Sequence, residues 1–555
     1  MITSESAVFD ASLQFSTVRP FGVYALSGLA SDGSHLLGLD RIRGYLVRIN
    51  PHTNNTEILN PHSVGDWVEA SGLAVWDNQI WFAKGQEVFW CDRQTLTPNL
   101  FARLPHPVSG VAVWDSIVYV ACPQAGHIYG FDREKAQLTV RLPQVGVGFK
   151  SMAATETELW VCDHTEQTVF CLDRTTGQVR FKTLTPFASP TGIAFYRPTA
   201  AAEPLCYIAY ALEEPYIRDD PNADSPYQLT FRDRTFIHPL HWYQDPTAHY
   251  TLSNGYLVEL SYVEELLPLE AVTLNNVEWR IALPSNTQRQ RVRSIEPIGH
   301  PFTIEEQEGE QVAVFRFDQL QPHQGGLLGW RAQVEMYGLK YQLTPEDIPS
   351  GVSLPSDWQQ RYLADNDELA MDQSIVRRAA QAAVGTETNV LRKMLRIRNY
   401  VYDRLSYGIR PKIDTPDLVL ERGIGSCGEY VGVLLAIARL NGIACRTIGR
   451  YKCPPHPDWK SLPLEPDFNH VWLEFYVPGI GWLPMESNVD DVIERGPYPE
   501  RFFMGLAWYH AELGKGIKFE KMTADNLPEH ISVGDLAINH IRFTIVEELK
   551  PKLIE

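Results

Sequence analysis

The chain has 555 residues, with 49 lysines and arginines against 68 aspartates and glutamates, and a formal net charge of −19. This length predicts about three domains with substantial hydrophobic cores. The excess of acidic residues argues against a nucleic-acid partner. The sequence contains no run of 18 apolar residues, so no membrane-spanning helix is predicted.

The chain start and the cysteines bear on location. The opening residues MITSESAVFDASLQF lack the basic and apolar regions of a secretory signal. The eight cysteines have no regular spacing and no Cys-x-x-Cys pair, so a disulfide framework is not expected. We therefore expect a cytoplasmic protein without membrane contact, and no motif in the sequence requires a cofactor.

The first 200 residues repeat at intervals of about 40 residues. Similar tetrads begin at Ser27, Ser71, Ser109, Ser151 and Thr191. Each tetrad opens an apolar segment that predicts a strand, and further short strands separated by polar turns follow it. Four short strands per repeat are typical of a β-propeller blade. We predict an all-β propeller of about six blades over residues 1–265, in which YLVELSYVEELLPL and the strand-like segment before Ser27 form the sixth blade and close the ring.

Two features of this region have structural interpretations. Asp-Arg pairs at 92–93, 132–133 and 173–174 end the third strand of a repeat, where we expect them to form turns. Residues 197–250 form an irregular insertion whose length is more typical of a functional loop or lid than of a connector. Its three histidines, His238, His241 and His249, match no tetrahedral metal pattern, so a solvated loop is favoured over a metal site.

The remaining chain changes character twice. Residues 270–345 alternate apolar and polar side chains between turn residues, which predicts a small β-sandwich. Residues 350–555 begin with helical patterns and continue with mixed strands, which predicts an α+β domain.

Cys427 lies in the segment GIGSCGEYVGVLLAIARLNG. The glycines before it predict a sharp turn, and the apolar periodicity after it predicts a helix that ends at Asn441 and Gly442. A cysteine at a helix N-terminus is favoured as a thiolate, and the free amides there can hold an oxyanion. An isolated cysteine would more often be a packing residue, so the downstream partners decide the interpretation.

His470 and Glu486 supply those partners. HVWLEFYV and WLPMES predict two strands joined by a tight turn at PGIG. Antiparallel pairing would bring His470 and Glu486 side by side, where a carboxylate fixes the imidazole tautomer. A thiol, an imidazole and a carboxylate then form a nucleophile, its base and the group that orients the base.

These motifs resemble the transglutaminase-like superfamily of papain-like cysteine enzymes. The matching pattern is GSC, then HVWLE, then GWLPME, within residues 355–510. The resemblance implies a papain-like α+β core with Cys427, His470 and Glu486 as the catalytic residues. The family usually has Asp at the third position, so Glu486 departs from the pattern, and Asn488 is an alternative orienting group. Tyr407 is a candidate second oxyanion donor.

Three functional interpretations remain open. The favoured one is a cysteine protease or amidase that acts on peptide or glutamine amides of a protein or peptide substrate through a thioester. A crosslinking transglutaminase is the second, and a propeller that binds a protein partner beside an inert core is the third. A zinc site of Cys427, Cys445, Cys453, His456 and His470 is disfavoured by the spacing.

Overall fold

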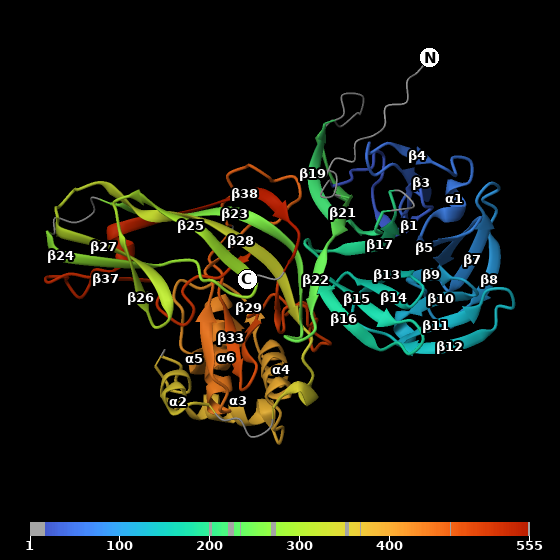
Figure 1. The fold of residues 1–555 in the computed structure, drawn as a ribbon. Coiled ribbons are helices and arrows are strands. Elements are labelled where there is room, and N and C mark those ends of the chain that lie inside the picture. Colours follow the sequence, from blue (N-terminus) through green and yellow to red (C-terminus); the bar gives the residue numbers. More distant parts are fainter. Residues whose placement is uncertain are drawn as a thin grey trace, which may run out of the picture. The chain divides into compact units, whose positions relative to one another are not determined.

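The computed structural model describes residues 17–198, 202–211, 213–219, 227–233, 235–267, 273–349, 354–366, 368–466 and 468–552. The chain divides into two compact units, Met1–Trp242 and Tyr243–Glu555, drawn as ribbons in Figure 1. No helix in the described ranges is long and apolar enough to cross a bilayer.

The first unit consists of antiparallel sheets formed by consecutive strands. Four sheets have four strands each: β1 (Leu26–Ser31), β2 (Leu36–Asp40), β3 (Tyr45–Ile49) and β4 (Thr56–Ile58); β5 (Ala70–Trp76), β6 (Gln79–Lys84), β7 (Glu87–Asp92) and β8 (Asn99–Arg103); β9 (Gly110–Trp114), β10 (Ile117–Cys122), β11 (His127–Asp132) and β12 (Leu138–Pro143); β13 (Phe149–Ala154), β14 (Glu158–Asp163), β15 (Thr168–Asp173) and β16 (Val179–Leu184). The fifth sheet contains β17 (Pro190–Tyr196), β18 (Leu205–Tyr210) and β21 (Phe236–Leu240). A short helix, α1 (Val64–Trp67), and a hairpin of β19 (Glu213–Asp219) and β20 (Tyr227–Asp233) complete the unit.

The repeated tetrads lie at the first strand of each sheet, where their glycines allow neighbouring sheets to approach closely. A Cβ atom on Gly72, at φ +60°, would lie 2.6 Å from the backbone nitrogen of Val111 in β9. A Cβ atom on Gly192 in β17 would lie 2.9 Å from the side chain of Leu29 in β1. The first strands pack in the order β1, β5, β9, β13, β17 and back to β1. Glycine stands at this position in four of the five tetrads, where a side chain would press on the neighbouring sheet, whereas β13 has the buried Met152 there.

A propeller requires such an order of first strands, but no sheet in the described residues closes on itself, and the propeller stays a prediction. Two expected details differ. The described residues contain five repeated sheets, whereas we expected about six blades. The segment YLVELSYVEELLPL, expected in the sixth blade, lies mainly in a long strand of the second unit. Its period-2 pattern predicts a strand equally well in either place.

The predicted irregular insertion is partly regular. β18 and β21 both fall within residues 197–250 and pair with each other, and the hairpin between them obscured the repeat in the sequence. His238 is buried in β21, with Nδ1 2.9 Å from the Thr17 hydroxyl, so it does not lie in a solvated loop. The Asp-Arg turns are confirmed as turns, because Asp132 accepts hydrogen bonds from the amides two and three residues later, as do Asp92 and Asp173.

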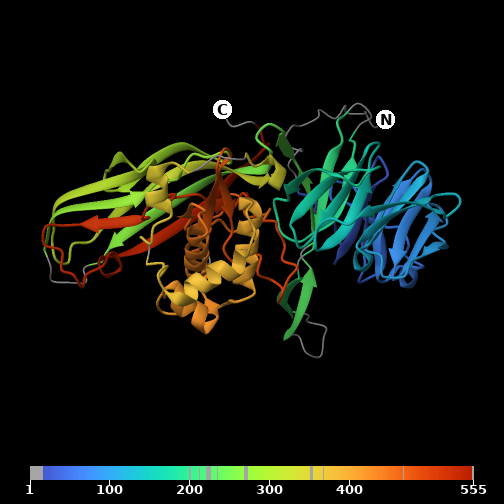
Figure 2. The same ribbon diagram turned by 90° about the horizontal axis from the view of Figure 1, so that it is seen from below.

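The second unit contains two large antiparallel sheets. The longer sheet comprises β22 (Trp242–Asp245), β23 (Tyr250–Leu266), β25 (Gln290–Gly299), β28 (Gly326–Tyr341), β35 (Gly505–Leu506) and β38 (Ala537–Leu549). The other comprises β24 (Leu274–Ala282), β26 (Thr303–Gln307), β27 (Glu310–Leu320) and β37 (Glu520–Thr523). Figures 1 and 2 both show the red strand β38 beside the green strand β23.

The helices of this unit lie with a small sheet in an α+β core. They are α2 (Ser356–Tyr362), α3 (Ser374–Val384), α4 (Val390–Tyr402), α5 (Pro416–Arg422), α6 (Cys427–Leu440) and the short α7 (Val533–Leu536) near the C-terminus. The small sheet has the order β31 (Cys445–Ile448), β33 (Trp472–Val477), β34 (Gly481–Met485). Short ladders pair β29 (Ser406–Tyr407) with β30 (Ile424–Gly425), and β32 (Tyr451–Lys452) with β36 (His510–Ala511). Helix α6 is buried on nearly every face, as its largely apolar sequence favours, and its two charged residues, Glu429 and Arg439, are buried too.

The predicted boundaries at 265, 270, 345 and 350 do not separate compact parts of the second unit. Strand β23 begins before the predicted sandwich and pairs with β28 on one side and β38 on the other. β37 and β38 come from the end of the predicted catalytic domain. Leu252 of β23 and Leu339 of β28 also pack in the same hydrophobic cluster as α3, α4 and α6. The predicted sandwich and the predicted catalytic domain are therefore not separate domains, because strands from both form the same sheets and the same hydrophobic core.

Candidate active site

Cys427 is the first residue of α6, as predicted. Gly423 ends α5 with φ +72°, a left-handed conformation that glycine adopts without strain. Ser426 then caps α6 together with Glu429, whose carboxylate accepts the Ser426 amide at 2.7 Å. The Cys427 side chain is half-buried, and its Sγ lies 3.7 Å from the carbonyl oxygen of Asn469. The thiol is thus held at the positive end of the helix dipole.

The predicted hairpin brings His470 and Glu486 together. β33 and β34 pair antiparallel, and the pair Leu473 and Met485 ends this ladder. His470 and Glu486 lie just beyond that end. His470 Nε2 lies 2.8 and 2.9 Å from the two carboxylate oxygens of Glu486. His470 and Glu486 are not directly opposite each other, because extension of the ladder would place His470 opposite Asn488. The longer glutamate side chain spans this offset.

The Nδ1 atom of His470 is the ring nitrogen available to the thiol. It is buried and has no hydrogen-bond partner within the described ranges at ordinary distance, whereas Nε2 is held by Glu486. Burial alone would raise the pKa of the Cys427 thiol, but the interaction with His470 and its charge, with the amides of Val471 and Gly428, lowers this pKa below its usual value. Burial likewise opposes the imidazolium, yet the Glu486 charge and the thiol raise the pKa of His470.

Glu486 receives more donors than the sequence predicted. His510 Nε2 lies 2.8 Å from Oε1, Lys452 Nζ lies 3.5 Å from the same oxygen, and the Ser487 amide donates to Oε2 at 2.9 Å. Burial would raise the pKa of this carboxyl, but the charges of His470 and Lys452 and the histidine hydrogen bonds hold it well below the usual range. We therefore expect Glu486 to be ionised at neutral pH in the folded protein.

His510 and Lys452 reach the carboxylate on adjacent strands. Lys452 of β32 is opposite His510 of β36 in a ladder of only two residue pairs. His510 is fully buried, and burial lowers the pKa of its imidazole to about 4. Its Nδ1 also lies 3.2 Å from the Ala507 carbonyl oxygen, and a neutral ring has one proton for two acceptors. We assign that proton to Nε2, because the charged carboxylate is the stronger acceptor.

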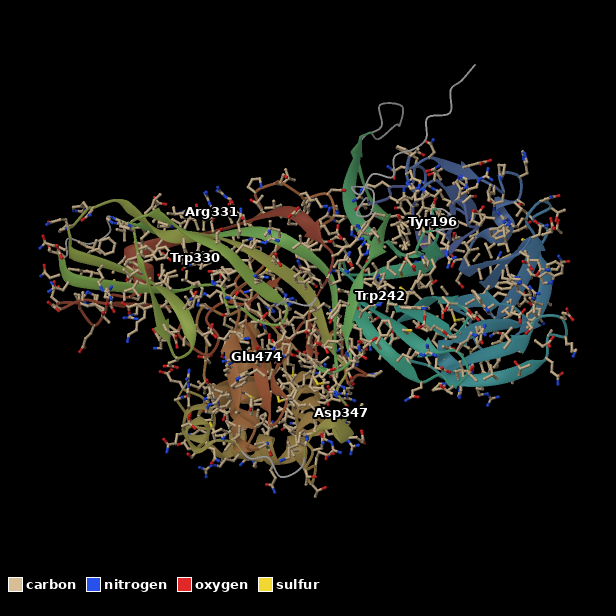
Figure 3. All side chains as sticks on the ribbon, in the orientation of Figure 1. Tyr196, Trp242, Trp330, Arg331, Asp347 and Glu474 are labelled. Carbon is tan, nitrogen blue, oxygen red and sulfur yellow. The ribbon has the colours of Figure 1, made fainter. Side chains whose placement is uncertain are left out.

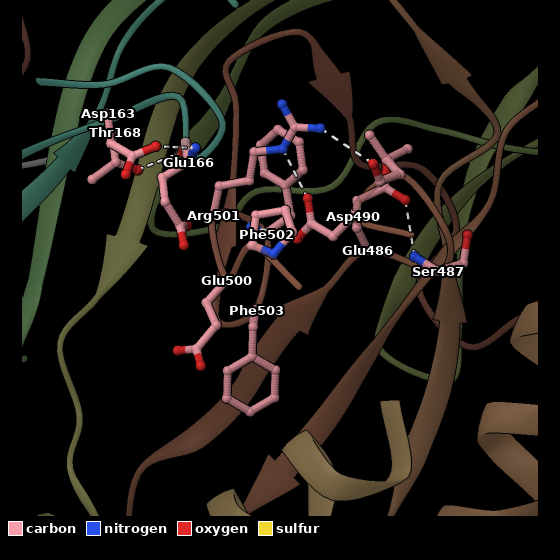
Figure 4. Close-up of polar contacts among 12 residues, drawn as sticks. Asp163, Glu166, Thr168, Glu486, Ser487, Asp490, Glu500, Arg501, Phe502 and Phe503 are labelled. Atoms are coloured by element: carbon pink, nitrogen blue, oxygen red, sulfur yellow. Dashed lines mark hydrogen bonds and ion pairs between the residues drawn. The ribbon is translucent and has the colours of Figure 1, made fainter. Parts of the chain in front are cut away.

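The chain after Glu486 is fixed by further buried ionic contacts. Arg501 Nε donates to Asp490 Oδ1 at 2.8 Å, and Asp490 also accepts the Phe502 amide at 3.2 Å. Figure 4 shows the Arg501–Asp490 pair beside Glu486 and its bond from the Ser487 amide. A second buried pair lies on the small sheet, where Arg446 binds Glu474 at 2.7 Å; Figure 3 labels Glu474 within the α+β core.

The remaining candidate residues from the sequence lie outside the Cys427–His470–Glu486 group. The Asn488 side chain accepts a hydrogen bond from the Ser487 hydroxyl at 3.0 Å, so Glu486 and not Asn488 is the hydrogen-bond partner of His470. Tyr407 of β29 is opposite Gly425 of β30, two residues before Cys427, and the Cys427 charge adds to burial in raising the pKa of its hydroxyl. Cys445 and Cys453 are both buried. Across the described ranges, no three side chains of His, Cys, Asp or Glu are grouped to hold a metal ion.

Sequence reasoning missed His510 and Lys452. His510 follows Glu486 by 24 positions in the segment AWYHAEL, and Lys452 precedes His470 in a strand of two residues. Neither segment has a periodicity or a motif that marks it. Only the pairing of two very short strands, which no local pattern encodes, places them at the carboxylate.

Comparison with known proteins supports a cysteine-enzyme family for this region. Residues 377–487 match the Transglutaminase-like superfamily, and the matched segment contains Cys427, His470 and Glu486. No curated protein matches the chain. The second unit thus contains a transglutaminase-like region, as the sequence motifs predicted.

Solved structures are similar only at low scores. A Cytophaga hutchinsonii protein proposed to be a cysteine protease has a TM-score of 0.36 and 14% identity, over 54% of this chain and 93% of that chain. A Myxococcus xanthus glutaminyl cyclase has a TM-score of 0.28 and 12% identity, over 40% and 97%. A chain of a nidogen–laminin complex has a TM-score of 0.27 and 12% identity, over 32% and 71%.

Proposed function

We propose that this protein is a cysteine-dependent acyl-transfer enzyme that hydrolyses peptide or glutamine amides. The observation that carries the proposal is the arrangement of Cys427 at the start of α6, His470 with Nδ1 available to the thiol, and Glu486 2.8 Å from Nε2. The lowered pKa of the thiol and the raised pKa of the imidazole favour a thiolate–imidazolium pair.

The proposed reaction has two steps. The Cys427 thiolate attacks the amide carbonyl carbon, the C–N bond breaks, and the proton on His470 Nδ1 passes to the departing amine, which leaves a thioester. Water then attacks the thioester after giving a proton to His470, and the carboxylic acid and the thiolate are released. Glu486 holds the imidazole in place and stabilises its charged form in both steps.

An oxyanion hole is proposed at the start of α6. The backbone amide of Cys427 is one donor, because the first amides of a helix have no partner within the helix. The Tyr407 hydroxyl is the second proposed donor, supported by the ladder that places Tyr407 opposite Gly425. Tyr407 is 46% exposed, so its hydroxyl can turn toward a bound substrate.

Hydrolysis and amine transfer differ in the acceptor of the thioester. We propose hydrolysis. Incubation with a glutamine-containing peptide and a dansylated primary amine separates the two outcomes, because hydrolysis releases ammonia and leaves glutamate, whereas transfer incorporates the fluorophore. Cys427→Ala should abolish both. If the wild-type protein processes no internally quenched peptide or glutamine peptide, and Cys427 is unreactive, the proposal fails and the binding-scaffold interpretation replaces it.

For the first unit we propose a propeller that binds a protein substrate or partner. The support is the order of contacts among the first strands of the five sheets and the close approach at Gly72 and Gly192. We also propose a cytoplasmic location, supported by eight cysteines that are all free thiols. Removal of the first unit should reduce activity on a folded protein substrate more than activity on a short peptide.

A further inference from the structure

Exposed apolar side chains gather around the candidate nucleophile. In the described part of the second unit, fourteen large apolar side chains are at least 36% exposed, and seven of them lie on the segments before Cys427, before His470 and after Glu486. We refer to these seven as the apolar rim: Tyr407, Ile409, Ile413, Ile424, Phe468, Val492 and Ile493. Exposed apolar side chains grouped near a candidate nucleophile are candidates for a binding surface.

One side of the rim lies beside the first turn of α6. A Cβ atom on Gly428, the residue after Cys427, would lie 3.3 Å from the Cδ1 atom of Ile413. A Cβ atom on Gly408 would lie 2.7 Å from the side chain of Ile424. Ile413 is nevertheless 74% exposed, so it touches the helix start with one edge and presents the rest to solvent.

The other side of the rim lies beside the imidazole. The Phe468 ring is edge-on to His470, with ring centroids 6.0 Å apart. On the Cys427 side, Tyr407 lines a cavity of about 470 Å³ with Val492 and Ile493, and the rest of its lining is largely polar or charged. This volume accommodates a few side chains and not a folded partner.

Ionic contacts fix the loop that carries Ile409 and Ile413. The Asp414 amide donates to Glu429 at 3.0 Å, and Arg422 forms ion pairs with both Asp414 and Glu429. The loop is therefore tied to the first turn of α6. An anchored loop that exposes isoleucines beside a nucleophile loses hydrophobic stabilisation unless a ligand covers them.

We propose that the apolar rim is the substrate-binding surface and that it selects an extended peptide with large aliphatic or aromatic side chains next to the scissile bond. This inference rests on the proposed function. The reason for assigning the rim to the substrate is that Ile413 lies against the residue after Cys427 and Phe468 lies against the His470 ring. A peptide in this position places its carbonyl carbon at the thiol and its flanking side chains on the two sides of the rim.

Peptide binding to full-length Cys427→Ala tests the proposal without turnover. Two fluorescein-labelled peptides of equal length are compared by anisotropy, one with Leu and Phe around a central Gln-Gly bond and one with Ser and Asn. We expect the apolar peptide to bind at least about tenfold more tightly, as expected for burial of one large apolar side chain. The Ile409→Ser/Ile413→Ser double variant in this background should reduce the preference to less than about threefold.

Ile304→Ser is the matched control, since Ile304 is 50% exposed on β26 of the same unit and outside the rim. It should retain the full preference. Equal affinities for the two peptides, or a preference that survives the double variant, would overturn the proposal. So would a dimer that the double variant converts to monomer with no change in peptide affinity.

Iodoacetamide labelling of Cys427, with the native thiol present, separates this inference from the proposed function. The Ile409→Ser/Ile413→Ser variant should change the labelling rate less than about twofold, because the groups that lower the thiol pKa are His470 and the amides of Val471 and Gly428. An unreactive Cys427 with an intact peptide preference would refute the proposed chemistry and leave the rim as a peptide-binding site. A reactive Cys427 without any peptide preference would support the chemistry and refute the rim as the substrate-binding surface.

Discussion

Replacement of Glu486 by glutamine removes the buried charge on which the proposed base depends. The carboxylate is 1% exposed and accepts His470 Nε2 at 2.8 and 2.9 Å, and His510 Nε2 and the Ser487 amide also donate to it. An amide of the same length keeps one acceptor oxygen and turns its NH₂ group toward a donor. The charge-assisted bond to His470 is worth about 1.5–3 kcal/mol, and the stabilisation of the developing imidazolium is lost in addition.

The expected loss of kcat is about 10³–10⁴-fold, which corresponds to about 4–5.5 kcal/mol of transition-state stabilisation. The Glu486 charge raises the pKa of His470, so its removal should lower that pKa and thereby raise the pKa of Cys427. The alkaline limb of the kcat/KM profile should move to lower pH, and the acidic limb to higher pH.

Profiles of kcat/KM between pH 5 and 9 provide the assay, with thermal unfolding of each variant to exclude loss of the fold. Glu486→Asp keeps the charge but withdraws it by one methylene, so its activity should lie between those of wild type and Glu486→Gln. A Glu486→Gln protein with normal unfolding and an unchanged pH profile would refute the role of the carboxylate. A greater loss in Asn488→Ala would assign that role to Asn488.

Three further predictions concern the second histidine, the base and the extent of the fold. His510 remains neutral when folded down to about pH 4 but protonates near 6.5 when unfolded, so unfolding free energy should fall by about 3 kcal/mol between those pH values. His510→Gln should flatten this dependence in urea titrations, and an unchanged slope would contradict the assignment. His470→Ala should shift the pH midpoint of Cys427 alkylation upward, whereas an equal midpoint would show that the imidazole does not tune the thiol. A 243–555 protein should fold cooperatively by circular dichroism while a 268–555 protein, which lacks β23, should not; two equally stable fragments would show that β23 is dispensable.

The local part of the site could be predicted because its determinants are local. The glycines before Cys427 and the apolar periodicity after it predict the start of the helix, and the PGIG turn predicts the hairpin that brings His470 to Glu486. The diagonal register explains why Glu486, and not Asn488, reaches the imidazole. Sequence spacing predicts which two strands pair, but only approximately which residues are opposite each other. A shift of one or two residues in register depends on side-chain length and packing.

The non-local part could not be predicted. The strand over 250–266 has the same alternation whether it completes a sixth blade or a sheet with β28 and β38. His510 reaches Glu486 through a ladder of two residue pairs, too short to have a pattern. In both cases partners about 60 residues apart or more decide the structure, and strand pairing over such distances leaves no local signal.

Alkylation at pH 6 tests the central claim most directly. The other seven cysteines are buried, whereas Cys427 is half-buried and its thiol has a lowered pKa. Native protein treated with iodoacetamide and analysed by peptide mass spectrometry should carry the label on Cys427 at least about a hundredfold faster than on any other cysteine. Slow labelling of Cys427, at a rate similar to that of an ordinary thiol at this pH, would contradict the nucleophile.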